Sequence, residues 1–227
     1  MTDIARLTAH EILAPTFLFR FAVPIKHVET PWTATGKNAG ANLDESFRLP
    51  SFGELEGRRL FADFRGAWHE SGLAFHVRVA GKRQHPWCRE SRLDESDGLH
   101  LWVDTRDTHN IHRAGRFCHR FAFLPMGSGR KLTDPIAAPV LIARAREHPK
   151  PAREGAIAAI SHVVADGYEL SAFIPAEAMT GWDTTNHTRL GFTYAVTDRE
   201  LGWQTFTIGR EFPFTEDPSL WGTVELV

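Results

Sequence analysis

Tryptophan, histidine and arginine supply most of the side chains in this sequence that could bind a ligand. Trp87 lies in a polar loop beside Gln84, His85 and Cys88. An indole in such a loop can stack on a sugar ring, because it offers a flat apolar face beside polar neighbours. The alternative is an indole that folds back over the edge of the protein, and the loop sequence leaves both interpretations open.

A second group of polar side chains lies on predicted strands, where alternate residues share one face. In the segments 72–79, 98–104, 116–124, 168–174 and 189–197, apolar residues occupy one parity. The other parity carries His76, Arg78, His100, Trp102, Arg120 and Glu169, with the small residues Ser171, Gly191, Thr193 and Ala195. If the strands belong to one sheet, these residues predict a concave polar and aromatic face for a small ligand. The alternative is the solvated face of an antiparallel sheet.

Carboxylates and histidines near position 105 raise the question of a metal site. Asp104 and Asp107 place hard oxygen atoms on a turn, as calcium requires, so we predict them as metal ligands with calcium as the possible cofactor. His109 and His112 suit zinc or iron by chemistry. Side chains three residues apart converge on a helix, whereas this segment is predicted to be a loop, so their spacing is not diagnostic.

The sequence contains none of the motifs that mark a common active site. Gly-x-Ser-x-Gly, the Walker loop, Gly-x-Gly-x-x-Gly and His-Glu-x-x-His are all missing. We therefore expect a protein that is not an enzyme. A glycoside hydrolase stays open as an alternative, because its two acids are recognised by their separation in space and not by a motif.

The elements that position these residues are predicted to be strands. Period-two runs rich in β-branched and aromatic residues, bounded by Gly, Pro, Asp or Asn, cover residues 16–23, 58–68, 72–79, 98–104, 116–124, 140–145, 157–164, 168–174, 189–197, 203–208 and 223–227. Asp166-Gly167 predicts a hairpin turn, and Pro175–Met179 predicts one helical turn. Many short strands without βαβ alternation predict an all-β fold, a two-sheet antiparallel β-sandwich of jelly-roll type.

Length and charge favour a single globular domain over residues 1–227. The net charge of −2 is spread along the chain without a basic stripe, so nucleic acid is not an expected partner. No apolar run is long enough to span a membrane, and we see no signal peptide, so a cytoplasmic location is favoured. Cys88 and Cys118 could pair, but two thiols give no framework signature, and reduced thiols suit that location better.

Three segments, in order, resemble the family 9 carbohydrate-binding modules and the wider DOMON-like group. They are residues 72–79 with Pro86-Trp87 and Asp97–Asp104, residues 167–175 with Arg189–Asp198, and the ending Asp217–Leu226. The resemblance covers residues 58–227, while residues 1–57 form an N-terminal extension with a strand. It implies a sandwich of two antiparallel sheets, often with bound calcium, in which two tryptophans clamp a sugar.

The resemblance also implies which residues bind the sugar. Trp87 matches the first clamp tryptophan, His100 replaces an acidic residue of the family pattern, and Trp203 lies earlier than the second clamp position. We expect a module that binds a mono- or oligosaccharide and works beside a separate carbohydrate-active enzyme. One alternative is an interaction or structural domain that has lost sugar binding. Another is a haem- or metal-binding DOMON-like domain, for which Met126 and Met179 are the internal methionines.

Overall fold

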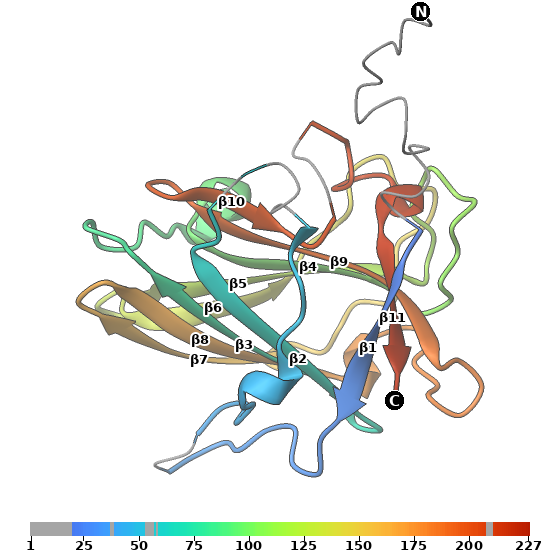
Figure 1. The fold of residues 1–227 in the computed structure, drawn as a ribbon, viewed down its shortest axis with the longest axis horizontal. Helices are drawn as coiled ribbons and strands as arrows, with labels where there is room; N and C mark the ends of the chain where they lie inside the picture. Colours follow the sequence, from blue (N-terminus) through green and yellow to red (C-terminus); the bar gives the residue numbers. More distant parts are fainter. Residues whose placement is uncertain (1–19, 37–38, 53–56, 58, 208–210) are drawn as a thin grey trace, which may run out of the picture.

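The computed structural model describes residues 20–36, 39–52, 57, 59–207 and 211–227, and two β-sheets packed face to face form its body (Figure 1). Sheet A has the order β6-β5-β4-β9-β11, with β10 beside β9, and sheet B has the order β2-β3-β8-β7. The strands are β1 Ala22–His27, β2 Ala62–His69, β3 Gly72–Ala80, β4 Gly98–Asp104, β5 Cys118–Ser128, β6 Asp134–Pro139, β7 Ala158–Val164, β8 Gly167–Pro175, β9 Arg189–Asp198, β10 Gly202–Thr205 and β11 Gly222–Leu226. The predicted all-β sandwich is confirmed.

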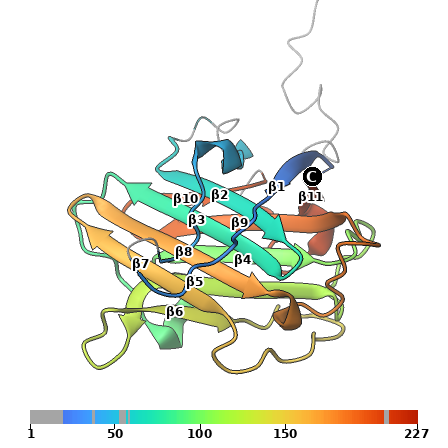
Figure 2. The same ribbon diagram turned by 90° about the horizontal axis from the view of Figure 1, so that it is seen from below.

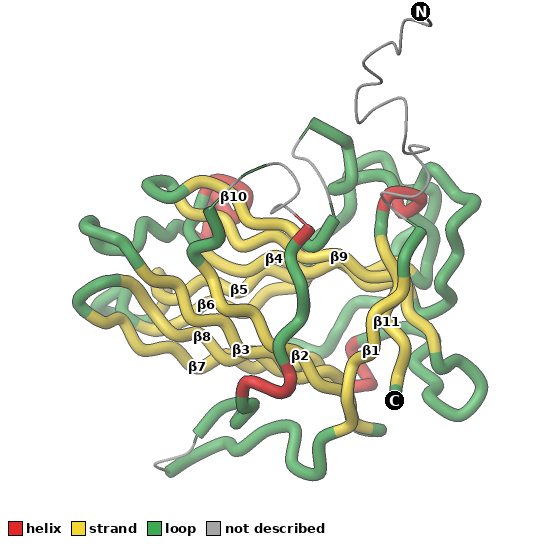
Figure 3. Tube along the Cα trace, viewed as in Figure 1, coloured by secondary structure: helices red, strands yellow, loops and turns green. Residues whose placement is uncertain are grey.

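Strand β1 joins the two sheets. Residues Ala22–Ile25 pair with β11 of sheet A, and Lys26 and His27 pair with β2 of sheet B. Both pairings are parallel, whereas the other strand pairs between described residues are antiparallel. The backbone of this one strand therefore belongs to both layers (Figure 3).

The main core lies between the sheets and is built from the parity that the sequence predicts to be apolar. Sheet A contributes Leu99, Leu101, Val103, Phe121, Phe123, Phe192, Tyr194 and Val196, and sheet B contributes Phe64, Leu73, Phe75, Val77, Val79, Tyr168, Leu170 and Ile174. Rings from the two layers touch, as Phe75 and Phe192 do with centroids 5.9 Å apart. Burial of these side chains is the main stabilising contribution to the sandwich.

The segment between β1 and β2 covers the outer face of sheet B. Figure 2 shows it crossing in front of this sheet. Ala41 and Leu43 of the segment pack with Ala67 and Ala74 of the sheet. The Trp32 ring lies parallel to Phe173 of β8, with centroids 6.1 Å apart. An outer sheet face that the sequence predicts to be open is thus partly covered by the chain itself.

Two predicted strands differ from the observed ones. The apolar run 140–145 is not a strand, because Ile142 turns inward while Leu141 is exposed and Arg144 has φ 58°. The strand is β6, just before it. It contains Pro135 and Pro139, which are tolerated because β6 is an edge strand. The first strand lies at 22–27 instead of 16–23, and residues 16–19 of that prediction lie outside the described residues.

Turns and helices follow the predicted pattern closely. The Asp166-Gly167 hairpin joins β7 to β8, and a single 3-10 turn occupies Ala176–Ala178. The remaining described helices are the 3-10 turns η2 Glu45–Phe47, η4 Glu90–Glu95 and η6 Pro218–Leu220. Among the described residues, no helix is long and apolar enough to cross a membrane.

Candidate functional site

A cavity of about 330 Å³ opens on the outer face of sheet A, and we call it the sheet A cavity. Its lining consists of Asp94, His100, Trp102, Arg120, Ala143, Trp203, Thr215 and Glu216. Strand pairing explains why the central residues converge, since Trp102 of β4 lies directly opposite Arg120 of β5. His100 lies between Ala122 and Ala195 on the neighbouring strands, and their small side chains leave space around the imidazole.

The imidazole of His100 is buried in this cavity without a hydrogen-bond partner. Its exposed fraction is 1%, and neither Nδ1 nor Nε2 contacts a donor or acceptor among the described residues. Burial lowers the pKa of His100 to about 3, with the nearby Arg120 charge adding to the effect. The ring is therefore neutral at physiological pH, with one nitrogen able to donate and the other able to accept.

Arg120 completes the polar part of the cavity. One terminal nitrogen forms an ion pair with Asp94 of η4, whereas the buried Nε atom has no partner among the described residues. Buried polar atoms are nearly always hydrogen-bonded in folded proteins. An unpaired imidazole and an unpaired guanidinium nitrogen lining one cavity are the arrangement expected of a site whose ligand supplies the missing partners.

The two tryptophans of the cavity have different environments. Trp102 is 1% exposed, its Nε1 donates to the carbonyl oxygen of Thr215 at 3.2 Å, and the Arg120 guanidinium lies 5.0 Å from its ring centroid. Trp102 therefore forms the back wall and offers no open stacking face. Trp203 of β10 is only partly buried and lies 6.5 Å from the Phe214 ring. It is the aromatic side chain that a ligand in the cavity can reach from solvent.

Trp87 lies outside the lining of the sheet A cavity. Its ring is partly buried, with the Arg199 guanidinium 4.3 Å from the ring centroid and Arg89 at 5.4 Å. Its backbone N–H donates to Oδ2 of Asp97 at 3.0 Å. The indole is thus partly buried, with two arginine side chains over its ring, in the loop before β4.

A buried ion triad fixes this loop. Nζ of Lys82 lies 3.0 Å from Oδ2 of Asp97 and 2.5 Å from Oδ2 of Asp198, and all three side chains are almost fully buried. Burial opposes the charge on Lys82, but hydrogen bonds from its ammonium to Asp198 and Asp97 outweigh this and raise its pKa. The triad therefore joins the two ends of the loop between β3 and β4, at Lys82 and Asp97, and anchors them to the end of β9 through Asp198.

The predicted single polar face is wrong, because its strands divide between the two sheets. His76, Arg78 and Glu169 lie on the outer face of sheet B, on the opposite side of the sandwich from His100, Trp102 and Arg120. Period two fixes the face of each side chain but does not reveal which sheet its strand joins.

The sheet B group has partners of its own. Arg78 lies 2.6 Å from Oδ1 of Asp166 and 3.6 Å from Oε1 of Glu169. Nδ1 of His76 lies 3.1 Å from Oγ of Ser171, and burial lowers the pKa of this imidazole. Gly40 passes so close to Ser171 that a Cβ atom there would lie 2.8 Å from its hydroxyl oxygen. The segment between β1 and β2 thus occupies part of the outer face of sheet B, where a ligand was predicted to bind.

The two predicted calcium ligands are engaged by the protein itself. Asp104 accepts hydrogen bonds from the backbone N–H groups of Arg106 and Thr108, and its burial raises the pKa of the carboxyl. Asp107 accepts from the Thr223 hydroxyl and forms an ion pair with Arg189. These oxygens accept hydrogen bonds and face a cation. Calcium binding at this turn stays a prediction.

Cys88 and Cys118 are both buried and free. They belong to different clusters, Cys88 with Leu124 and Ile136, and Cys118 with Trp102 and Ala114. Burial raises the pKa of each thiol to about 12, so neither is a thiolate at neutral pH.

Sequence reasoning did not identify the acidic wall of the cavity. Asp94 comes from η4 and Glu216 from the segment between β10 and β11. Both lie outside the strands, in a short 3-10 turn and a loop, where no period-two pattern reveals the direction of a side chain. Their positions in the sequence could still have pointed to the site. Asp94 lies between Trp87 and His100, and Glu216 lies beside Asp217–Leu226, the last segment that resembles the family.

Comparison with solved structures supports the fold. A family 9 carbohydrate-binding module from Caldicellulosiruptor kristjanssonii in complex with cellotriose has a TM-score of 0.59 and 11% identity, covering 91% of this chain and 93% of that one. Such a module from the same organism in complex with glucose has a TM-score of 0.58 and 12% identity, covering 91% and 96%. No protein-family model matches the sequence, and no curated protein matches it. The chain has the fold of the family 9 carbohydrate-binding modules.

Proposed function

We propose that this protein is a non-catalytic saccharide-binding module whose site is the sheet A cavity. One observation carries the proposal: a fully buried imidazole without partners, His100, lines a cavity together with a partly buried tryptophan and an arginine. The solved proteins with this fold carry cellotriose and glucose, which supports the class of ligand. A separate carbohydrate-active enzyme is the partner that such a module would serve.

The cavity offers what a sugar ring needs. Its volume lies at the small end of the range of roughly 300–1,000 Å³ for ligand pockets, which suits one sugar unit or the end of a chain. Asp94 and Glu216 can accept hydrogen bonds from sugar hydroxyl groups, while the buried nitrogens of His100 and Nε of Arg120 can bond a hydroxyl only when a ligand displaces the side chains that cover them. Trp203 offers an apolar surface to the carbon-bound hydrogens of the ring.

Isothermal titration with glucose, cellotriose and a panel of other mono- and oligosaccharides tests the proposal. We expect one saccharide class to bind, and the variants Arg120→Met and Trp203→Ala to weaken it at least tenfold. Each removes one contact worth about 1.4 kcal/mol or more in a desolvated site. Arg78→Met and Trp87→Ala are the matched controls, since they change the same residue types outside the cavity and should leave affinity unchanged.

A second function is favoured by the covered tryptophans. Because Arg120 lies over Trp102, and Arg199 and Arg89 lie over Trp87, the indole faces that could stack on a sugar are packed by the protein itself. An interaction domain that has lost sugar binding would have this property. Failure of every saccharide to bind the folded protein would contradict the first function and favour this one. Binding that Arg78→Met weakens and Arg120→Met does not would place the site on sheet B.

A further inference from the structure

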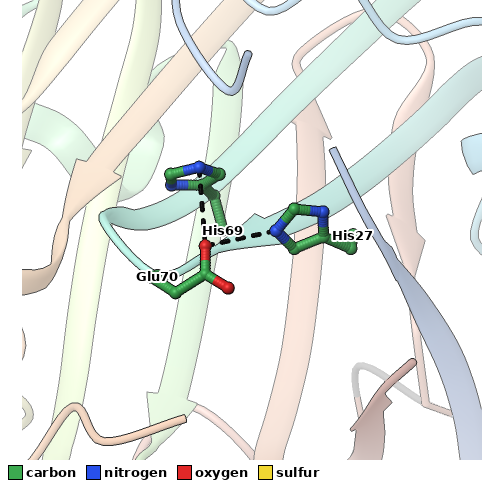
Figure 4. Close-up of side chains that lie close together, drawn as sticks. All are labelled: His27, His69 and Glu70. Carbon is green, nitrogen blue, oxygen red and sulfur yellow. Dashed lines mark hydrogen bonds and ion pairs between the residues drawn. The ribbon is translucent and has the colours of Figure 1, made fainter. Parts of the chain in front are cut away.

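Two histidines and one glutamate converge at the end of the sandwich where β1 meets the β2–β3 hairpin. Within residues 20–36, 39–52, 57, 59–207 and 211–227, His27, His69 and Glu70 are the one group of three His, Cys, Asp or Glu side chains whose ligand atoms all lie within 4.8 Å of one another. Figure 4 shows one carboxylate oxygen of Glu70 facing both imidazole rings. None of the three lines the sheet A cavity.

The distances match those between ligands of one metal ion. Oε2 of Glu70 lies 3.2 Å from Nε2 of His27 and 3.5 Å from Nε2 of His69. Ligand atoms about 2.1 Å from a tetrahedral zinc ion stand about 3.4 Å apart. Both nitrogen–oxygen separations thus agree with a shared ion, and the ligand atoms of the two imidazoles lie within 4.8 Å of each other.

Neighbouring groups orient the two rings. The His27 ring lies nearly perpendicular to the Trp68 ring, with centroids 4.7 Å apart, and the His27 backbone N–H donates to the carbonyl oxygen of Val227 at 2.8 Å. Nδ1 of His69 lies 2.8 Å from Oγ of Ser71. A metal-bound imidazole usually donates its other N–H to an oxygen, which fixes the ring and its tautomer. Nδ1 of His69 also accepts from the backbone N–H of Ser71 at 3.1 Å, so zinc binding at Nε2 requires that this hydrogen bond be exchanged for one from Nδ1–H to the Ser71 hydroxyl.

The group is also reachable from solvent and carries the charge that a cation needs. The side chains of His27 and Glu70 are 38% and 63% exposed. The pKa of the Glu70 carboxyl is lowered, first by its own backbone N–H and then by a hydrogen bond with His27. Two imidazoles with one carboxylate are a donor set for zinc, whereas calcium and magnesium prefer oxygen ligands.

We propose that His27, His69 and Glu70 form a zinc site that ties strand β1 to the β2–β3 hairpin. Three protein ligands leave the fourth position of a tetrahedral ion to water. His27 is the last residue of β1, and His69 ends β2, so the bound ion bridges the strand that joins the two sheets to the hairpin of sheet B. Zinc binding to the folded chain alone raises the midpoint of thermal unfolding.

Cobalt and zinc titrations of the untagged protein test the site. Cobalt in a tetrahedral histidine–carboxylate site gives visible absorption bands, so we expect them to saturate at one ion per chain and to disappear when zinc displaces cobalt. His27→Ala, His69→Ala and Glu70→Gln should each weaken zinc binding at least tenfold. They should also abolish the rise in unfolding midpoint that zinc gives the wild type.

The matched control is His112→Ala. This residue also lies beside a carboxylate, with Nδ1 3.1 Å from Oδ2 of Asp217, but it belongs to no group of three convergent ligands among the described residues. Zinc affinity and the cobalt bands should survive that substitution. The proposal is wrong if the wild type binds no zinc at millimolar concentration, or if His27→Ala and His69→Ala bind it as tightly as His112→Ala does.

Discussion

At the scale of single residues, His100 makes the stability of the protein depend on pH. Its pKa is about 3 in the folded protein and about 6.5 in an unfolded chain. Between these values only the unfolded state takes up the proton, so the free energy of unfolding falls as the pH falls from about 6.5 toward about 3. Above pH 6.5 the ring is neutral in both states, so it no longer lowers the free energy of unfolding.

The variant His100→Gln removes this titration. Urea unfolding at pH 7 and pH 5 should show that the wild type loses about 2 kcal/mol more than the variant over this interval, because one proton binds to the unfolded chain. His85→Gln, at an exposed position, is the control and should lose as much as the wild type. Equal losses in the wild type and in His100→Gln would contradict the buried, neutral imidazole.

The sequence predicts the direction of individual side chains better than it predicts which other residues surround them. Period two places His100, Trp102 and Arg120 on the outer side of their strands, and the structure brings them together in one cavity. It also places His76 on an outer face, but that face belongs to sheet B. Sheet membership depends on long-range pairing, which a local pattern does not encode.

At the scale of elements, the Lys82 triad determines how the loop before β4 is held. Lys82→Met leaves the carboxylates of Asp97 and Asp198 buried without their cation, so we expect a loss of about 3–5 kcal/mol in the free energy of unfolding. Chemical denaturation measures the loss, and Lys26→Met, at an exposed position of β1, should stay within about 0.5 kcal/mol of wild type. A loss below about 1 kcal/mol for Lys82→Met would show that the two acids are protonated or rehydrated at little cost.

The sequence did not predict that the segment between β1 and β2 covers the outer face of sheet B. Residues 29–57 lack a clear period, so they predict a long excursion without saying where it packs. In the structure its apolar residues Ala41 and Leu43 fill the space above Ala67 and Ala74. Ala67 and Ala74, two small residues on the outer parity of β2 and β3, were a local sign that another layer of chain approaches there.

At the scale of the whole molecule, the shared strand β1 couples the two sheets. Ile25 is 1% exposed, lies in the main core and pairs with Leu226 where β1 passes from sheet A to sheet B. A side chain at this point contacts the packing of both layers. Loosening it should therefore affect both sheets together, and the sandwich should unfold in one cooperative transition.

The variant Ile25→Ala tests this coupling. Truncating a buried isoleucine costs about 2–5 kcal/mol, because apolar burial is lost and a cavity remains. We expect the urea midpoints from far-ultraviolet circular dichroism, which follows the strands, and from near-ultraviolet circular dichroism, which follows aromatic packing, to fall by the same amount. Val164→Ala, at an exposed position of the edge strand β7, should change the free energy of unfolding by no more than about 0.5 kcal/mol and leave both midpoints nearly unchanged. Two separate transitions in Ile25→Ala would mean that each sheet folds without the other, and that β1 is an attachment to sheet A instead of the link between the layers.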